Sequence, residues 1–174
     1  MNLDLFAEMS PEDARAFLRT FLERGEAFAT GLGIRQVGLD HMPNVLLDLS
    51  KEMRVTPRPA DPNVPAFIRE TKEYRSGLFD FTSESIDSIV GAAWSLGQAF
   101  LATYPFMAWG IGDAAYATKR MPVVLGFKAG MELPPLLVVR NMFARRVRDP
   151  QSDTHIETTI RTWRRHALET PVGD

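Results

Sequence analysis

A long uncharged stretch is the feature that most restricts how this chain can fold. Between Asp87 and Asp113 no side chain carries a charge. The stretch is long enough to cross a bilayer, but it contains serines, glycines, a glutamine and Pro105, and such groups are expensive to place in lipid. No Lys or Arg stands close to either end as an interfacial anchor. We therefore expect a buried core helix followed by a strand, in water, with a membrane span as the weaker alternative.

The first part of this stretch belongs to the best-marked helix of the sequence, expected over about Ser83–Tyr104. Thr82 or Ser83 can cap its start, and Pro105 ends it because proline cannot continue a helix. Apolar residues cover most of its faces, which predicts burial on several sides. Gly91 and Gly97 lower the helix propensity, so we expect another element to pack closely against the backbone at these two positions.

Five further helices are predicted, over about residues 11–31, 42–53, 65–75 and 136–147 and from 154 onward. The first begins at a Ser10 cap followed by proline. Asp40 is the expected cap of the second, and Phe67 and Ile68 are expected to point inward from the third. Helix and strand remain open for the Leu-Leu-Val-Val segment at 136–139, because a short apolar run fits both.

Two short segments rich in aromatic and β-branched residues are predicted strands, 106–111 and 122–128. The loop between them suits an antiparallel pair. The composition, with 45% hydrophobic and 24% charged residues, is that of an ordinary globular protein. The predicted fold class is thus α+β, mostly helical, with five to six helices on a small antiparallel sheet. Residues 1–174 are expected to form a single domain, with a proline-rich linker at about 56–65.

The sequence contains none of the motifs that are typical of common catalytic or cofactor sites. It lacks cysteine, which excludes thiolate metal sites, iron–sulfur clusters, disulfides and a cysteine nucleophile. It also lacks the glycine-rich nucleotide loops, the zinc-protease helix motif and the hydrolase nucleophile elbow. The three histidines, His41, His155 and His166, are best explained by helix ends. We predict no catalytic residues, no metal and no cofactor.

Arginines gather in the C-terminal third and form the strongest signal outside the core. Residues 1–117 hold 10 basic and 16 acidic side chains, a net charge of −6, whereas residues 118–174 hold 10 basic and 6 acidic ones, a net of +4. If the two C-terminal helices are neighbours, the arginines form a positive strip for an acidic partner. They can equally be solvated or paired within the chain. The candidate binding residues are Arg145, Arg146, Arg161, Arg164 and Arg165.

Nucleic acid is not the expected partner of this strip. The whole chain has a net charge of −2, and Trp163 falls on the apolar side of its helix rather than among exposed stacking residues. An alternative site for an enzyme or a small ligand lies near Trp109, Tyr116 and Arg140, where a pocket could form at the end of the uncharged stretch. Core packing is the simpler explanation of these aromatic residues.

The stretch from Gly91 to Val139 resembles a layout found in several small bacterial α+β domains of unknown function. It contains a glycine-bearing apolar helix (GAAWSLGQAFLATYP), a tryptophan strand (MAWGIG), a second strand (PVVLGF) and a proline-started segment (LPPLLVV). Some proteins of this build resemble immunity or toxin-partner modules. The resemblance implies a partner-binding bacterial protein and transfers no site residues.

These observations favour a non-enzymatic module that binds another macromolecule through a charged surface. The partner is expected to be a protein with an acidic surface. The missing cysteines agree with a cytoplasmic location, and the acidic N-terminus, with Asp4 and Glu8, does not resemble a signal peptide. Self-association through residues 88–112 is a third hypothesis.

Overall fold

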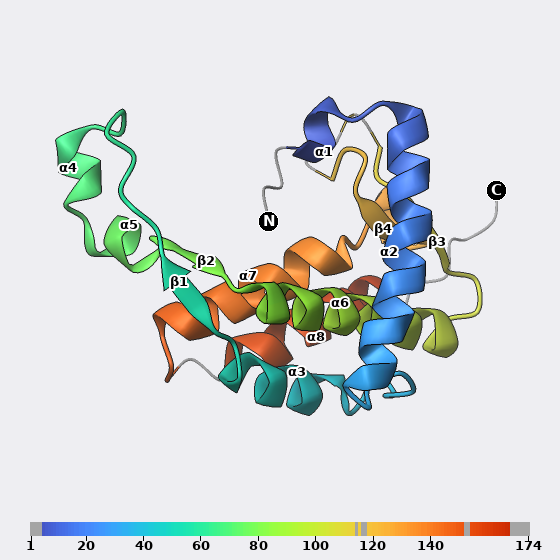
Figure 1. Cartoon of the computed structure of the whole chain (residues 1–174). Coiled ribbons are helices and arrows are strands. Elements are labelled where there is room, and N and C mark those ends of the chain that lie inside the picture. Colours follow the sequence, from blue (N-terminus) through green and yellow to red (C-terminus); the bar gives the residue numbers. More distant parts are fainter. Residues whose placement is uncertain (1–4, 114, 116–117, 152–153, 168–174) are drawn as a thin grey trace.

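The computed structural model of the protein describes residues 5–113, 115, 118–151 and 154–167, and it is mostly helical (Figure 1). Its helices and strands are, in chain order, α1 (Leu5–Glu8), α2 (Pro11–Gly31), α3 (Met42–Lys51), β1 (Val55–Pro57), α4 (Ala66–Arg69), α5 (Lys72–Ser76), β2 (Phe79–Phe81), α6 (Ser83–Thr103), β3 (Ala108–Ile111), β4 (Pro122–Leu125), η1 (Lys128–Gly130), α7 (Pro135–Arg148) and α8 (Thr154–Ala167). The strands pair antiparallel, β1 with β2 and β3 with β4. The predicted α+β, mostly helical fold is confirmed, with two small strand pairs in place of one sheet.

Helix α6 forms the centre of the core. Ile89, Trp94 and Phe100 on this helix are 1%, 6% and 0% exposed. Helix α2 crosses it, while α7 and α3 pack along it (Figure 1). The helical part of the uncharged stretch is therefore interior, as predicted, and the apolar area that it removes from water is a main source of stability. This burial leaves α6 little surface through which to associate with a second copy. After α6 the stretch comes partly to the surface, where Phe106 is 47% exposed.

The described residues contain no helix that combines the length and the apolar character needed to cross a membrane.

Two glycines of α6 allow close packing against the helix backbone, as expected. A Cβ atom at Gly91 would lie 3.0 Å from the backbone nitrogen of Ala29 in α2. A Cβ atom at Gly97 would overlap the indole ring of Trp109 in β3. The two glycines thus bring α2 and β3 directly against α6.

Side-chain caps fix the starts of the two longest helices where they were predicted. The Ser10 hydroxyl accepts a hydrogen bond from the backbone N–H of Asp13 at 3.0 Å, and the Thr82 hydroxyl accepts one from Ser85 at 3.4 Å. Residues 136–139 lie in α7, which begins at Pro135. The helix is therefore the correct alternative for the Leu-Leu-Val-Val segment.

The strands β3 and β4 are shorter than predicted but paired as expected. Their register places Trp109 opposite Val124. Strand β4 ends at Leu125 because Gly126 adopts a left-handed backbone with φ of 104°, which turns the chain away from the ladder. Leu133 then returns to make an isolated bridge with Val124, just before α7 begins.

Residues 55–81 form an arm that projects from the body (Figure 1). Strands β1 and β2 are its base, with Val55 opposite Phe81, and α4 and α5 lie at its outer end. The proline-rich segment 56–65 therefore begins inside a strand, which the sequence did not predict. The expected single helix over 65–75 is wrong, because the Thr71 hydroxyl accepts from the Tyr74 N–H and starts a new helix.

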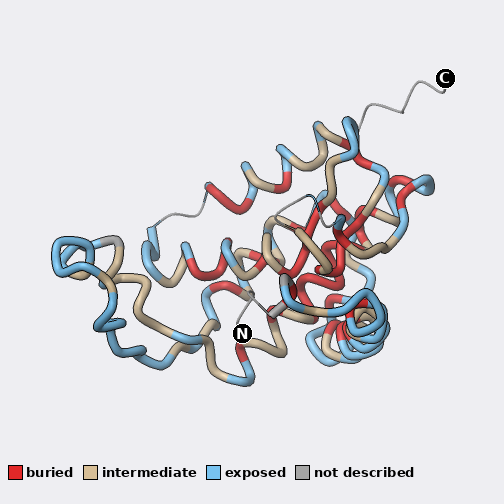
Figure 2. Tube along the Cα trace, turned by 90° about the horizontal axis from the view of Figure 1, so that it is seen from above, coloured by how far each residue is buried: buried red, intermediate tan, exposed pale blue. Residues whose placement is uncertain are grey.

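The inward orientation expected for Phe67 and Ile68 is also wrong. Phe67 is 75% exposed and Ile68 is 39% exposed. In the arm, no residue whose burial is described is buried, whereas the buried residues gather in the body (Figure 2). The arm carries these side chains away from the core, so they have no apolar surface of their own chain to face.

Candidate interaction site

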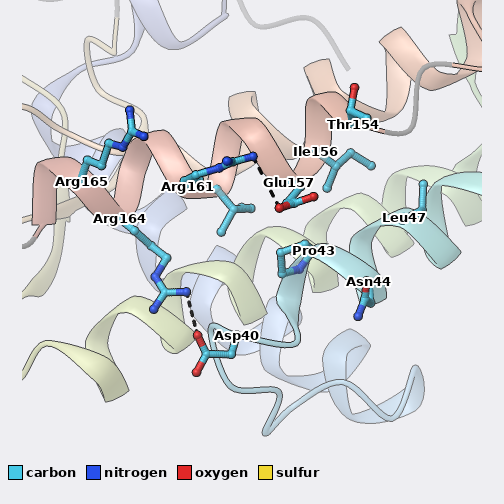
Figure 3. Close-up of a pocket in the computed structure, with 11 residues that line it drawn as sticks. Asp40, Pro43, Asn44, Leu47, Thr154, Ile156, Glu157, Arg161, Arg164 and Arg165 are labelled. Carbon is cyan, nitrogen blue, oxygen red and sulfur yellow. Dashed lines mark hydrogen bonds and ion pairs between the residues drawn. The ribbon is translucent and has the colours of Figure 1, made fainter.

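Helices α3 and α8 enclose a groove of about 620 Å³ on the surface of the body (Figure 3). Its floor is apolar and its rim is charged. Eleven residues from these helices, and from the turn before α3, line it: Asp40, Pro43, Asn44, Leu47, Thr154, Ile156, Glu157, Ile160, Arg161, Arg164 and Arg165.

The helical periodicity of α8 separates its floor residues from its rim residues. Ile156 and Ile160, four positions apart, are each 1% exposed and face the body. Glu157, Arg161 and Arg165 repeat the same spacing one position later and lie on the exposed side. The amphipathic pattern of the sequence therefore builds a floor and a charged rim from one helix.

Helix α3 supplies the opposite wall. Leu46 is fully buried, so the next residue, Leu47, is turned by about 100° around the helix and remains half-buried at the groove. Pro43, in the first turn, extends this apolar wall. The groove thus exposes apolar side chains that the fold does not cover.

Arg164 and Asp40 join α8 to the turn before α3. The Arg164 guanidinium donates a hydrogen bond to the Asp40 carboxylate at 2.7 Å (Figure 3). The prediction that Asp40 caps α3 is therefore wrong. The residue before α3 is His41, which makes no side-chain cap bond. Backbone bonds from His41 and Met42 to the Gly38 carbonyl close this helix start, which leaves the Asp40 carboxylate available to Arg164.

The charge of Arg164 is fixed by its surroundings. The hydrogen bond that Arg164 donates to Asp40 is the largest influence, and the Tyr104 hydroxyl adds to it, so that the pKa of Arg164 is raised above its ordinary value. A permanently charged guanidinium binds anions but does not exchange protons near neutral pH. The groove therefore offers binding chemistry at this position rather than acid–base chemistry.

Arg161 and Arg165 complete the basic rim. Arg161 lies 3.5 Å from Glu157, one helical turn earlier, and forms an ion pair with it. Arg165 points away from Asp40 (Figure 3), and it makes no hydrogen bond or ion pair with the described part of the chain. Three arginines face two carboxylates, so the rim keeps one excess positive charge, at Arg165.

The structure divides the predicted positive strip. Arg145 and Arg146 lie in the last turn of α7 and do not line the groove. Helices α7 and α8 do touch, since the His155 ring nitrogen Nε2 is 3.0 Å from the Met142 carbonyl. That contact is at the start of α8, however, whereas Arg161, Arg164 and Arg165 lie toward its end. The five predicted binding residues therefore form two groups.

Comparisons with protein-family models, with curated proteins and with solved structures gave no match. The resemblance in layout to immunity-like domains stays a prediction.

The alternative site at Trp109, Tyr116 and Arg140 receives no support from the surroundings of its members. Trp109 packs edge-on against Phe21, with ring centroids 5.6 Å apart, while burial and then Arg58 lower the pKa of Arg140 at the base of the arm. Tyr116 lies outside the described residues. Neither Trp109 nor Arg140 lines the groove.

The remaining polar candidates serve local structure. His155 is buried against α7, and the described residues include no group of three histidines or carboxylates placed to hold a metal ion. Trp163 packs against Phe127 with ring centroids 5.3 Å apart. It therefore belongs to the edge of the core, as the apolar side of its helix predicted.

Sequence reasoning missed the α3 side of the groove. The available signal was Leu47, because it is apolar but lies outside the buried face of α3, which is formed by Met42, Leu46 and Ser50. Nothing in the sequence indicated that Asp40 lines the groove, because its expected role as a helix cap accounted for it. The joining of Asp40 to Arg164, across 124 positions of sequence, requires the tertiary fold.

Proposed function

We propose that this protein is a non-enzymatic, cytoplasmic module that binds a segment of another protein in the groove between α3 and α8. The bound segment has apolar side chains for the floor and acidic side chains for the arginine rim. The observation that carries this proposal is the half-buried apolar wall of Pro43 and Leu47, which lines the same groove as Arg165. The charge of Arg165 has no partner in the described part of the chain.

The exposure of the two ion pairs at the rim also favours an acidic segment as the ligand. Arg164 and Asp40 are 39% and 79% exposed, and Arg161 and Glu157 are 57% and 67% exposed. Exposed pairs of this kind contribute about 0–1 kcal/mol. An incoming carboxylate can therefore replace Asp40 or Glu157 at little cost, while the apolar contacts supply most of the affinity.

A pair of fluorescent synthetic peptides tests the proposal. One has leucines and phenylalanines separated by glutamates, and the other has lysine in place of every glutamate. We expect the acidic peptide to bind in a fluorescence anisotropy titration and the basic peptide not to bind. Arg165→Glu replaces an attraction by a repulsion, each of up to about 1 kcal/mol at an exposed position, so it should weaken binding by about tenfold.

The matched control is Arg145→Glu, which makes the same charge change at an exposed arginine outside the groove. It should leave the affinity for the acidic peptide unchanged. Equal effects of the two substitutions would mean that the net charge of the chain, rather than the groove, attracts the peptide.

A further inference from the structure

The outer end of the arm, residues 66–76, is here called the tip, and it presents apolar side chains to solvent. Phe67 and Ile68 of α4 are 75% and 39% exposed. Within the described residues, the main contacts of α4 and α5 are with each other. Because the arm carries the tip away from the body (Figure 1), these two side chains can reach a flat surface without the body coming between.

The tip also carries more cations than acids. Arg69, Lys72 and Arg75 stand against Glu70 and Glu73, a net charge of +1 in a chain whose total is −2. The local charge of the tip is thus opposite in sign to that of the chain as a whole. An anionic surface therefore attracts the tip.

Two of these cations line one cavity, of about 360 Å³. Nε of Arg75 donates a hydrogen bond to the backbone carbonyl of Arg69 at 3.4 Å, which places the two side chains together. The Arg69 guanidinium itself makes no hydrogen bond or ion pair with the described part of the chain, and its Nε is buried. A phosphate group bound between the two arginines would supply the missing acceptors, since guanidinium and phosphate form strong paired hydrogen bonds.

We propose that the tip docks on a membrane surface of anionic phospholipids. Phe67 and Ile68 enter the boundary between headgroups and acyl chains, as the apolar side chains of interfacial segments do. Arg69 and Arg75 bind a lipid phosphate, and Lys72 adds to the attraction. A free phosphate would use the arginines but leave the adjacent apolar pair in water, so the combination favours a lipid. The inference does not depend on the groove, which no residue of the tip lines.

Sedimentation of the full chain with phospholipid vesicles tests the inference. We expect binding to vesicles of phosphatidylcholine mixed with phosphatidylglycerol, and much weaker binding to phosphatidylcholine alone. Phe67→Glu should weaken binding to the mixed vesicles by about tenfold or more, because it removes apolar burial and adds a negative charge. Arg69→Gln should weaken it by about fivefold, because one basic side chain is lost from the surface.

Glu70→Gln should have the opposite effect. Glu70 lines the cavity beside the two arginines, so loss of its charge should strengthen binding to the mixed vesicles by about fivefold. Phe106→Glu and Arg145→Gln are the matched controls, because both residues are exposed but lie outside the arm. They should bind like the unmodified chain. Circular dichroism melting of each variant verifies that it is folded.

A fluorescent label separates insertion from attraction at a distance. The chain has no cysteine, so Ile68→Cys provides a single attachment site for a nitrobenzoxadiazole dye, whose emission rises in an apolar environment. We expect the emission to rise when the mixed vesicles are added. The same dye attached through Phe106→Cys should not respond.

Four results would overturn the inference: no binding to the mixed vesicles, equal binding to phosphatidylcholine alone, binding that survives Phe67→Glu, or an equal response of the dye at both positions. Calorimetric binding of inorganic phosphate without binding of vesicles would also overturn it, because the cavity would then take a free anion. Weaker binding of the acidic peptide to the Phe67→Glu chain would assign the tip to a protein partner instead. If the peptide bound and the vesicles did not, the proposed function of the groove would stand without this inference.

Discussion

At the scale of single residues, Gly97 shows how a missing side chain determines packing. The position that a Cβ atom would take is occupied by the indole ring of Trp109. Trp109 is held in turn by Phe21 and by its place in β3, so the ring has little freedom to move. A glycine inside a helix is accepted here because it brings β3 against α6.

Gly97→Ala should therefore destabilise the protein despite the better helix propensity of alanine. Overpacking of this kind costs about 1–3 kcal/mol, against a gain of about 1 kcal/mol from propensity. The free energy of unfolding from urea denaturation measures the difference. Gly31→Ala is the control, because a Cβ atom there meets nothing within 4 Å, and it should not destabilise.

Asp40 gives a second prediction at this scale. Asp40→Asn removes the charge that competes for Arg164, so it should strengthen binding of the acidic peptide about twofold, while the free energy of unfolding changes by less than about 1 kcal/mol. Anisotropy titration and urea denaturation measure the two effects. Weaker peptide binding in this variant would mean that Asp40 is needed to hold Arg164 in place.

Residue roles that depend on local rules could be predicted from the sequence. The caps at Ser10 and Thr82 and the close packing at Gly91 and Gly97 follow from hydrogen-bonding and steric needs within a few positions. Asp40 could not be assigned in this way, because a local role as a helix cap accounted for it. Its partner, Arg164, lies far away in sequence, and the choice is made by the packing of α8 beside α3.

At the scale of elements, the start of α6 contains the Thr82 cap and, two residues later, the carboxylate of Glu84. Hydrogen bonding of Glu84 to its own backbone N–H, and then to the Thr82 hydroxyl, lowers its pKa below the ordinary value of 4.5. A lowered pKa means that the charged form stabilises the folded state. That stabilisation is present above pH 4.5 and is lost as the pH falls through the lowered pKa.

Glu84→Gln should consequently melt at a lower temperature than the unmodified chain at pH 7. The difference should shrink as the pH falls below 4.5, because Glu84 then loses its charge in both states. Differential scanning calorimetry at several pH values provides the comparison. A difference of constant size down to the acid limit of folding would show that the charge of Glu84 is not its cause.

Long elements were predictable and short ones were not. Helices α2 and α6 have enough turns for the apolar period and the end signals to agree. Strands β1 and β2 are too short to show a period, and their pairing depends on the return of the chain through α4 and α5. The break between those two helices comes from the Thr71 cap, which the apolar pattern around it concealed.

At the scale of the whole molecule, the arm and the groove could not be foreseen from the apolar pattern. Such a pattern indicates that a side chain avoids water, but it does not say whether its own core or another molecule covers it. Phe67, Ile68 and Leu47 are the residues where this ambiguity mattered. In the structure Phe67 and Ile68 are exposed at the outer end of the arm, and Leu47 is half-buried in the wall of the groove.

The described residues of 58–78 do not belong to the hydrophobic core, whereas Phe81 at the base of the arm packs against it. The outer end of the arm should therefore be dispensable for folding. Replacing residues 58–78 by a short glycine–serine turn keeps β1 and β2 and the base of the arm. We expect the free energy of unfolding to change by no more than about 1 kcal/mol, or the melting temperature by about 3 °C. Calorimetry at low protein concentration checks this. Collapse of the cooperative transition would show that α4 and α5 support the core.

The groove between α3 and α8 is the central claim, and mapping the bound peptide on the protein tests it most directly. A titration of isotope-labelled protein with the acidic peptide, followed by two-dimensional NMR, reports each backbone amide separately. We predict that the shifted signals cluster at residues 40–47 and 154–165, while Arg145 and its neighbours in the last turn of α7 stay unchanged. Shifts centred on that turn of α7, or no shifts at saturating peptide, would contradict the claim.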